Sequence, residues 1–278
     1  MIGAPFLDDV TPALREKGQK LFDKLVEMGS LVVAYSGGVD SSLLCAVAYQ
    51  ALGDRLLAVT VHSPVEVPGD SELAAAVAQE VGFRHLIVEL NDLENPQFVA
   101  NPPDRCYHCK LARLKAIQAV AAEVGAAAVA EGSNADDGDD YRPGARAVAE
   151  LGVRSPLAEA GLTKAEIRVL AQALHLSIWD RPSGPCLATR FPYGTPVTLQ
   201  GLKQIAAGEA FLREKHYQPA RVRYFGKTAR LEVAPEAVEQ LMAEREDVLL
   251  FFKNIGFTYV VVDLAGYRSG SMNEGIIP

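Results

Sequence analysis

The sequence predicts an α/β protein: a doubly wound parallel sheet followed by a smaller α+β domain. Over the first half of the chain, short apolar runs that suit buried strands alternate with helical stretches of about a dozen residues. A glycine- and serine-rich turn follows the first of these runs. Towards the carboxyl terminus the alternation gives way to helices and a hairpin pattern. We therefore expect one domain over residues 1–185 and another over residues 186–278.

Each element of the first domain follows from its hydrophobic spacing. Leucine, valine and methionine recur at helical intervals over residues 11–29, and unbroken apolar runs indicate strands buried on both faces. Thr163 and Glu166 form a capping box, which predicts that a helix starts there. The other expected elements are strand 31–35, helix 43–52, strand 56–62, helix 69–81, strand 84–90, helix 105–124 and strand 126–130.

The second domain has a different pattern, with helices and a hairpin of short strands. Mixed elements of this kind indicate a small α+β domain, which we assign to substrate binding or oligomerisation. Its expected elements are a helix near 198–216, hairpin strands 221–225 and 230–233, a helix near 235–253 and a strand over 258–264.

Composition and charge exclude several classes of protein. The chain has 278 residues, 49% of them hydrophobic, and no run approaches the roughly 18 apolar residues of a membrane span. The first residues lack the pattern of a signal peptide, so we expect a cytoplasmic protein with no membrane partner. The net charge of −8 argues against a nucleic-acid partner, because such binding needs clustered Lys and Arg.

The most informative segment is Ser36-Gly37-Gly38-Val39-Asp40-Ser41-Ser42, between a predicted strand and a predicted helix. Glycines let successive N–H groups converge on one point, and the dipole of the following helix adds to their field, so the turn suits an anion. The segment lacks the lysine of a Walker loop and does not match the dinucleotide fingerprint. The simpler interpretation is a glycine turn that only connects two elements.

This segment resembles the PP-loop of the ATP pyrophosphatase superfamily, which has an adenine nucleotide alpha hydrolase-like fold. Residues 131–137 resemble the G-[ST]-N-x-x-D turn of that superfamily, and Ser155-Pro156-Leu157 resembles a stretch of NAD and GMP synthetases. The resemblance implies that ATP, with Mg²⁺ held by Asp40, is cleaved between its α- and β-phosphates to adenylylate a substrate. The expected ATP-binding residues are Ser36, Gly37, Gly38, Asp40, Ser41, Ser42, His62 and Gly132.

Three of the four cysteines are candidates for chemistry. Cys106 and Cys109 open a predicted helix at a spacing that puts both thiols on one side, and the helix amino terminus favours thiolates. With Cys186, they leave four interpretations open: a redox pair, a zinc site that includes His108, packing in the core, or a [4Fe–4S] cluster. We favour the cluster, because three thiolates leave one iron that can carry a hydrosulfide. Cys45, inside an apolar helix, is expected to be a buried structural residue.

Three further segments narrow the family: residues 182–194, 221–226 and 263–274. With the PP-loop, and in the same order over nearly the whole chain, they resemble the LarE family, the ATP-dependent sulfur transferases that build the nickel-pincer nucleotide cofactor of lactate racemase. The resemblance implies a pyridinium dicarboxylate mononucleotide as substrate. Its adenylylated carboxylate would receive sulfur to give a thiocarboxylate and AMP. A homo-oligomer, a hexamer in this family, is also implied.

Members of this family obtain sulfur in two ways. Some sacrifice the cysteine that matches Cys186, and others carry two additional cysteines and resemble cluster enzymes. Cys106 and Cys109 place this chain with the second kind. The resemblance therefore implies that these three cysteines are catalytic and hold the iron, with sulfide or another sulfur donor as partner. Sacrifice of Cys186 remains the alternative.

The predicted hairpin carries candidate residues for the substrate phosphate. Arg221 and Arg223 alternate along one strand, so both face one side and can clamp a phosphate, with Glu232 of the partner strand to orient them. A solvated strand face is the simpler interpretation. The tail around residues 267–274 is rich in glycine and serine, and we expect it to fold over the site. Family position adds two substrate-phosphate residues, Arg190 and Glu209.

Three rival functions stay open at this point. A tRNA 2-thiolation enzyme also combines a PP-loop with three cysteines, although the acidic charge argues against it. An amide synthetase of the NAD-synthetase kind would leave the three cysteines without a role. A nucleotide-binding regulator would release no pyrophosphate from ATP.

Overall fold

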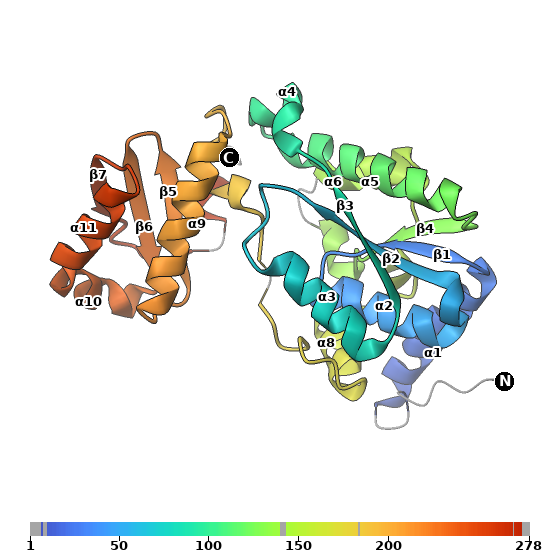
Figure 1. Ribbon diagram of the computed structural model, residues 1–278. Coiled ribbons are helices and arrows are strands. Elements are labelled where there is room, and N and C mark those ends of the chain that lie inside the picture. Colours follow the sequence, from blue (N-terminus) through green and yellow to red (C-terminus); the bar gives the residue numbers. More distant parts are fainter. Residues whose placement is uncertain (1–6, 8–9, 140–142, 183, 269, 274–278) are drawn as a thin grey trace. The chain divides into compact units, whose positions relative to one another are not determined.

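The structure, a computed structural model, describes residues 7, 10–139, 143–182, 184–268 and 270–273 (Figure 1). Contacts divide the chain into two compact units, which are described separately. The first unit comprises Met1–Ser63, Gly69–Leu90 and Cys106–Ser183, and the second comprises Pro64–Pro68, Asn91–Arg105 and Gly184–Pro278. Within the described residues, no helix is long and apolar enough to span a membrane.

The first unit is built on a parallel sheet with the strand order β3-β2-β1-β4. In the register of the sheet, Leu31 lies opposite Leu56 on one side and Ala128 on the other. The predicted parallel sheet is confirmed, with small shifts at the strand ends. Its strands are β1 (Leu31–Ala34), β2 (Leu56–His62), β3 (Arg84–Glu89) and β4 (Ala128–Glu131).

Helices cover both faces of this sheet, as Figure 1 shows. Consecutive strand residues point to opposite faces. Leu31 and Val33 therefore join one buried core, and Val32 joins another. The predicted doubly wound arrangement is confirmed. The first core includes residues of α1 (Pro12–Met28), α2 (Val39–Leu52), α3 (Asp70–Val81) and α8 (Lys164–Ala173), and the second includes residues of α5 (Arg105–Glu123) and α6 (Pro143–Glu150).

The start of one helix, α2, differs from the prediction in a way that affects the glycine turn. The capping box of Thr163 and Glu166 is present at the start of α8, as predicted. However, α2 begins at Val39 rather than at residue 43, so Asp40 and Ser41 lie in its first turn. Asp and Ser have low propensity for helix interiors but are favourable at an amino terminus, which is why residue preference alone placed the start too late.

Three helices of the first 183 residues were not predicted: α4 (Pro96–Val99), α6 and α7 (Pro156–Glu159). Each has only one or two turns, which is too short for hydrophobic periodicity to be read. Proline stands at the first position of each, and this is the signal that could have located them.

The second unit holds a three-stranded sheet in the order β5-β6-β7. The predicted hairpin is confirmed, because β5 and β6 are antiparallel, with Arg221 opposite Glu232. The third strand runs parallel to β6. Val222 and Leu231 point to the face that helices cover, where they are fully buried. The strands are β5 (Ala220–Phe225), β6 (Thr228–Val233) and β7 (Tyr259–Val262), and the first covering helix is α9 (Leu199–Glu214).

The prediction of one helix over residues 235–253 is wrong. The chain breaks at Glu244, whose φ is −90° and ψ 15°. Leu241, Val248 and Phe252 are all buried and keep helical spacing across the break, so the apolar pattern does not register it. The segment contains a 3₁₀ turn (Pro235–Ala237), α10 (Val238–Ala243) and α11 (Arg245–Asn254).

Candidate functional site

The glycine turn after β1 has the conformation of an anion site. Gly37 has a φ of +71°, and a Cβ added to it would lie 2.8 Å from the Cβ of Ala74, so no other residue fits there without strain. Gly38 is the N-cap of α2 and has no side chain to satisfy the first N–H groups of the helix. Ser41 donates from its hydroxyl to the carbonyl of Gly38 at 3.1 Å. The turn thus leaves the amino terminus of a long helix open to an anion.

The three serines of this turn have different surroundings. The hydroxyls of Ser36 and Ser41 lie 3.1 Å apart. Ser42 is fully buried, and its hydroxyl donates to the phenol oxygen of Tyr35 at 3.4 Å. Ser42 therefore supports the turn from behind with its side chain, whereas Ser36 stands on the exposed side.

Gly132, which follows β4, packs directly against the glycine turn. A Cβ on Gly132 would lie 3.0 Å from the backbone nitrogen of Ser41 and 3.2 Å from its Cα. Only glycine allows this approach, so the end of β4 is fixed against the first turn of α2. The two segments that resemble the PP-loop superfamily are therefore in contact.

Behind Gly132, a buried carboxylate gathers several donors. Glu131 accepts hydrogen bonds from the ammonium of Lys110 at 2.8 Å, the hydroxyl of Ser155 at 2.6 Å and the backbone N–H of Ser133 at 3.0 Å. Burial alone would raise the pKa of Glu131, but the charge of Lys110 and these hydrogen bonds together hold it below its ordinary value. Glu131 lies in a segment that the sequence singled out, but neither its role nor the part played by Lys110 was predicted.

Lys164 adds a cation beside the predicted magnesium ligand. Its ammonium lies 2.5 Å from Oδ2 of Asp40, and its backbone N–H donates to Asp136 at 2.8 Å. Sequence reasoning missed Lys164, although the capping box fixes it as the first residue of α8. Among the residues that the structure describes, no three His, Cys, Asp or Glu side chains form a metal-binding group. A magnesium ion on Asp40 would take its further ligands from phosphate and water, as this ion commonly does.

His62 ends β2 at the same edge of the sheet. Its Nδ1 lies 3.1 Å from the hydroxyl of Ser71 in α3. Carboxyl ends of parallel strands meet at one edge of the sheet. His62 at the end of β2 therefore lies at the same edge as the glycine turn after β1 and Gly132 after β4. Ligands of open α/β sheets bind at this edge.

Two of the three candidate cysteines open α5 in the first unit. Cys106 is exposed and Cys109 is partly exposed, so both thiols are accessible. Tyr107 between them donates to Glu150 of α6 at 2.8 Å, and the guanidinium of Arg146 lies 3.5 Å from the centre of its ring. These contacts fix the start of α5 against α6. Cys45 is fully buried, as expected, and burial raises its pKa.

The third candidate, Cys186, belongs to the second unit. It is partly exposed and caps a 3₁₀ helix, Leu187–Arg190. Arg190 at the end of this helix forms a two-pronged pair with Glu209 of α9, at 2.8 and 2.9 Å. It also donates to the carbonyl of Cys186 at 3.1 Å. Both Arg190 and Glu209 are buried.

The arginines of the hairpin are not equivalent. Glu232 has no exposed surface and accepts two hydrogen bonds from Arg223, at 2.9 and 2.7 Å, and one from Arg230 at 2.8 Å. Glu232 therefore orients Arg223 as expected, but its second partner is Arg230 rather than Arg221. Ser271 of the carboxyl-terminal tail accepts from Arg223 at 3.0 Å, so the tail is bonded to this cluster.

Arg221 differs from Arg223 and Arg230, because no carboxylate of the described residues pairs with it. Its guanidinium lies 5.2 Å from the centre of the Tyr267 ring and donates to the carbonyl of Ala220 at 2.7 Å. Burial and the neighbouring charge of Arg190 lower its pKa. Within the described part of the chain, it forms no ion pair with a carboxylate. A half-buried cation of this kind is suited to an anionic ligand.

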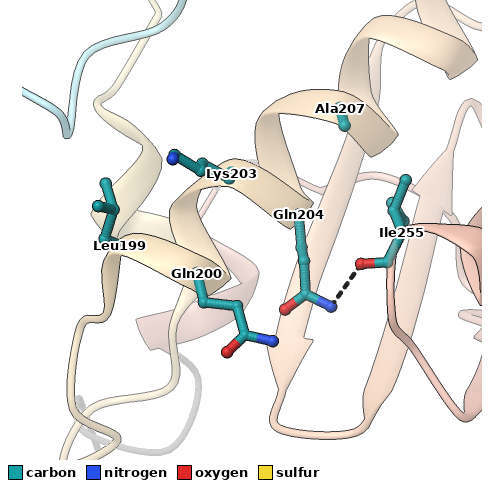
Figure 2. A pocket seen from close by; sticks show the side chains of 6 residues that line it. All are labelled: Leu199, Gln200, Lys203, Gln204, Ala207 and Ile255. Carbon is teal, nitrogen blue, oxygen red and sulfur yellow. Dashed lines mark hydrogen bonds between the residues drawn. The ribbon is translucent and has the colours of Figure 1, made fainter.

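Two surface hollows are lined by none of these residues. One, of about 500 Å³, is lined by small residues near the start of β4 in the first unit. The other, of about 480 Å³, lies along α9 in the second unit, and Figure 2 shows Gln204 bonded to the carbonyl of Ile255 at its edge. Its lining residues are Leu199, Gln200, Lys203, Gln204, Ala207 and Ile255.

The fold and the glycine turn define the class of this protein. A parallel sheet whose first strand leads through Ser-Gly-Gly-x-Asp-Ser into a helix amino terminus is an ATP-binding domain of the PP-loop kind. In agreement, the family profile of NAD synthase matches residues 16–103. A glutamine-hydrolysing GMP synthase from Methanococcus maripaludis has one subunit that is 30% identical over 67% of this chain and 62% of its own length.

Two relatives match almost from end to end. The pyridinium-3,5-bisthiocarboxylic acid mononucleotide synthase of Lactiplantibacillus plantarum is 34% identical over 94% of this chain and 95% of its own length. An uncharacterized protein of Synechocystis sp. is 42% identical over 94% of this chain and 98% of its own length. The chain belongs to the family of this synthase, the LarE family, and is an ATP-using enzyme of sulfur transfer.

Proposed function

We propose that the enzyme adenylylates a carboxylate of a pyridinium dicarboxylate mononucleotide and converts it to a thiocarboxylate. The observation that carries this proposal is the open helix terminus at Gly37 and Gly38 in a chain that matches a pyridinium-3,5-bisthiocarboxylic acid mononucleotide synthase over 94% of its length. A carboxylate is a poor acyl donor until its oxygen can leave. Attack of the carboxylate on the α-phosphate of ATP releases pyrophosphate, and attack of hydrosulfide on the mixed anhydride then releases AMP.

In this proposal the first unit binds ATP. The N–H groups at the start of α2 donate to phosphate oxygens, Ser36 donates from the exposed side of the turn, and Ser41 holds the turn through its bond to the Gly38 carbonyl. Asp40 holds Mg²⁺ against the phosphates, and the ammonium of Lys164, 2.5 Å from Asp40, supplies a second positive charge there. His62 and Gly132 border the nucleotide at the same edge of the sheet.

The sulfur would be delivered by a [4Fe–4S] cluster on Cys106, Cys109 and Cys186. None of the three is in a disulfide and all are at least partly exposed, which suits them as iron ligands. These three thiolates would hold three of the irons, and the cluster would supply an open coordination site for a hydrosulfide. The alternative is sacrifice of the Cys186 sulfur, which requires neither Cys106 nor Cys109.

The second unit would bind the substrate. Arg221, half-buried and without a carboxylate partner among the described residues, is the residue best suited to the phosphate of the mononucleotide, with Arg223 and Glu232 beside it. Assembly into homo-hexamers and a cytoplasmic location remain expectations that the family resemblance supports.

The test is anaerobic isolation followed by iron and sulfide analysis and an assay with the pyridinium substrate, ATP and sulfide. We expect about four irons per chain, several turnovers and substrate-dependent release of pyrophosphate. A colourless, iron-free protein that thiolates once per chain and loses the Cys186 sulfur would establish the sacrificial route. Loss of a 2-thio base from tRNA in a deletion strain, without any reaction of the pyridinium substrate, would overturn the proposal.

A further inference from the structure

Buried arginines hold the peptide carbonyls around Cys186. Arg190 donates from one nitrogen to the carbonyls of Pro185 at 2.7 Å and of Cys186 at 3.1 Å. Arg105 donates to the carbonyl of Ala188 at 3.0 Å. The carbonyl of Thr189 accepts a longer bond, 3.4 Å, from Arg223. Four of the five carbonyls from residue 185 to residue 189 therefore face guanidinium groups that come from three different parts of the chain.

Each of these arginines is itself fixed by a buried partner. The partners are Glu209 for Arg190, Glu232 for Arg223 and the side chain of Asn101 for Arg105. The relative exposures of the arginines are 2% for Arg190, 2% for Arg105 and 6% for Arg223. All three nitrogens of Arg190 and of Arg223 are bonded in this way, so these two groups have little capacity left to touch a substrate.

Two backbone bonds join residues of this turn, from Thr189 to Cys186 at 3.1 Å and from Phe191 to Ala188 at 3.2 Å. The 3₁₀ helix after Cys186 spans only Leu187–Arg190, and such short helices have poor hydrogen-bond geometry. Thr189 adds a further tie, because its hydroxyl donates to the carbonyl of Cys186 at 2.8 Å and accepts from Arg190 at 2.9 Å. The backbone N–H of Leu187 donates to the carbonyl of Val65 at 2.8 Å. The turn is thus held by its own Arg190 and Thr189 together with Arg105, Arg223 and Val65 from other parts of the chain.

We propose that Arg190, with Arg105 and Arg223, is a positioning residue that fixes the backbone of Cys186 and so determines where its thiol is presented. The proposal rests on the function proposed above for Cys186 as the sulfur site. It changes the expectation for Arg190 and Glu209: they act on Cys186 through its carbonyl and do not bind the substrate phosphate. Charge-assisted bonds from a planar guanidinium suit this task, because one group can satisfy several acceptors in a fixed geometry.

The experiment compares three full-length variants by hydrogen exchange and by kinetics. Arg190→Lys keeps the charge but loses the fork that reaches Glu209 and the two carbonyls. Thr189→Val keeps the shape and every arginine–carboxylate pair, and removes one hydroxyl with its bonds to Arg190 and to the carbonyl of Cys186. Arg213→Lys is the matched control, because Arg213 lies on α9 near Glu209 in sequence but is exposed. Amide exchange is followed for residues 187–191 and, as a fold control, for β6.

For Arg190→Lys, we expect exchange of the 187–191 amides to rise about 10-fold while β6 keeps its protection, and about 3-fold for Thr189→Val. The kcat of thiocarboxylate formation should fall about 30-fold in Arg190→Lys, with the KM for the mononucleotide unchanged, because only the placement of the thiol is altered. Arg213→Lys should match the wild type in every measurement.

Unchanged exchange in both turn variants, or a raised KM with unchanged exchange in Arg190→Lys, would overturn the proposal and return Arg190 to substrate binding. If Arg190→Lys loosens β6 as well, Thr189→Val decides, because it leaves the ion pairs intact. If the wild type shows no sulfur transfer at all, the proposed function fails, but the exchange measurements still report whether the arginines hold the turn.

Discussion

The glycine turn of the first unit and the cysteine turn of the second are built in opposite ways. Around the glycines, side-chain bonds join residues close in sequence, as in Ser36 with Ser41 and Ser41 with Gly38. Around Cys186, the bonds come from as far as Arg105, which is 83 residues from its acceptor. The glycine turn keeps its own N–H groups available to a ligand, whereas the cysteine turn has most of its carbonyls occupied. One turn is arranged to receive an anion, and the other to keep one side chain in place.

The largest effect is expected when the sulfur of Cys186 is replaced, and it tests whether the two turns have separate tasks. Cys186→Ser should lower thiocarboxylate formation at least ~10³-fold, because a hydroxyl is a poor iron ligand and supplies no sulfur. Pyrophosphate release that depends on the mononucleotide should stay within about 3-fold of wild type, because the proposed ATP-binding residues are in the other unit. A coupled pyrophosphate assay and mass spectrometry of the product measure the two steps separately.

Cys45→Ala is the control for that experiment, because Cys45 is a fully buried thiol with no role in the proposed chemistry. It should leave both steps unchanged, apart from a small loss of stability. Equal loss of pyrophosphate release and sulfur transfer in Cys186→Ser would show that the two turns do not have separate tasks.

The next largest effect is expected in the glycine turn. Gly37→Ala should lower the free energy of unfolding by about 2–4 kcal/mol and raise the Kd for ATP, because alanine is strained at φ +71° and its Cβ would meet Ala74 at 2.8 Å. Gly29→Ala is the matched control. Gly29 has nearly the same φ, +72°, but nothing lies within 4 Å of an added Cβ, so only the backbone strain should remain and the cost should be smaller. Urea unfolding and calorimetric titration with ATP measure both quantities; equal costs for the two variants would contradict the close approach.

The same contrast explains which features of the fold and of the site can be predicted from the sequence. The parallel sheet, the capping box and the glycine turn were predictable, because each depends on neighbouring residues whose spacing carries the signal. The location of Cys106 and Cys109 on one helix turn was predictable for the same reason. The ties from Arg105 and Arg223 to the cysteine turn were not, because a carbonyl acceptor has no side-chain signature and its donor can stand anywhere in the chain.

The prediction of which charged side chains pair was incomplete for a related reason. Register placed Glu232 opposite Arg221, as the hairpin predicts, yet the carboxylate pairs with Arg223 and Arg230. Long side chains reach diagonal neighbours in a sheet, so register alone does not determine which ions pair. Lys164 was missed because its partner Asp40 lies 124 residues away.

Lys164 offers a smaller effect that sharpens the account of the ATP site. Lys164→Met should raise the Kd for ATP about 10-fold, because a positive charge beside the phosphates is lost. Lys17→Met is the control, since Lys17 makes a similar pair with Glu166 of the same helix, at 2.8 Å, but away from the glycine turn. It should leave ATP binding unchanged. Isothermal titration with a non-hydrolysable ATP analogue gives both constants; equal weakening in the two variants would assign Lys164 to the stability of α8 instead.

The smallest effect concerns Glu131, the buried carboxylate behind the glycine turn. Its pKa is held below the ordinary value, so the folded state prefers the ionised form. The resulting stabilisation is complete above the pKa of the unfolded chain, near 4.5, and is lost as the pH falls through the lower folded value. Glu131→Gln should therefore be less stable than wild type by about 1–2 kcal/mol at pH 6, with a smaller difference at pH 3.

Urea unfolding from pH 3 to pH 6 follows this difference, with Glu123→Gln, an exposed carboxylate at the end of α5, as control. The sign is informative, because burial acting alone would raise the pKa of Glu131 and make the wild type relatively more stable in acid. A difference that grows as the pH falls would mean that the donors from Lys110, Ser133 and Ser155 do not outweigh burial. The glycine turn would then be supported by packing at Gly132 rather than by this charged network. In that case the two turns would also differ in the kind of interaction that supports them, which is packing in the first unit and charged hydrogen bonds from arginines in the second.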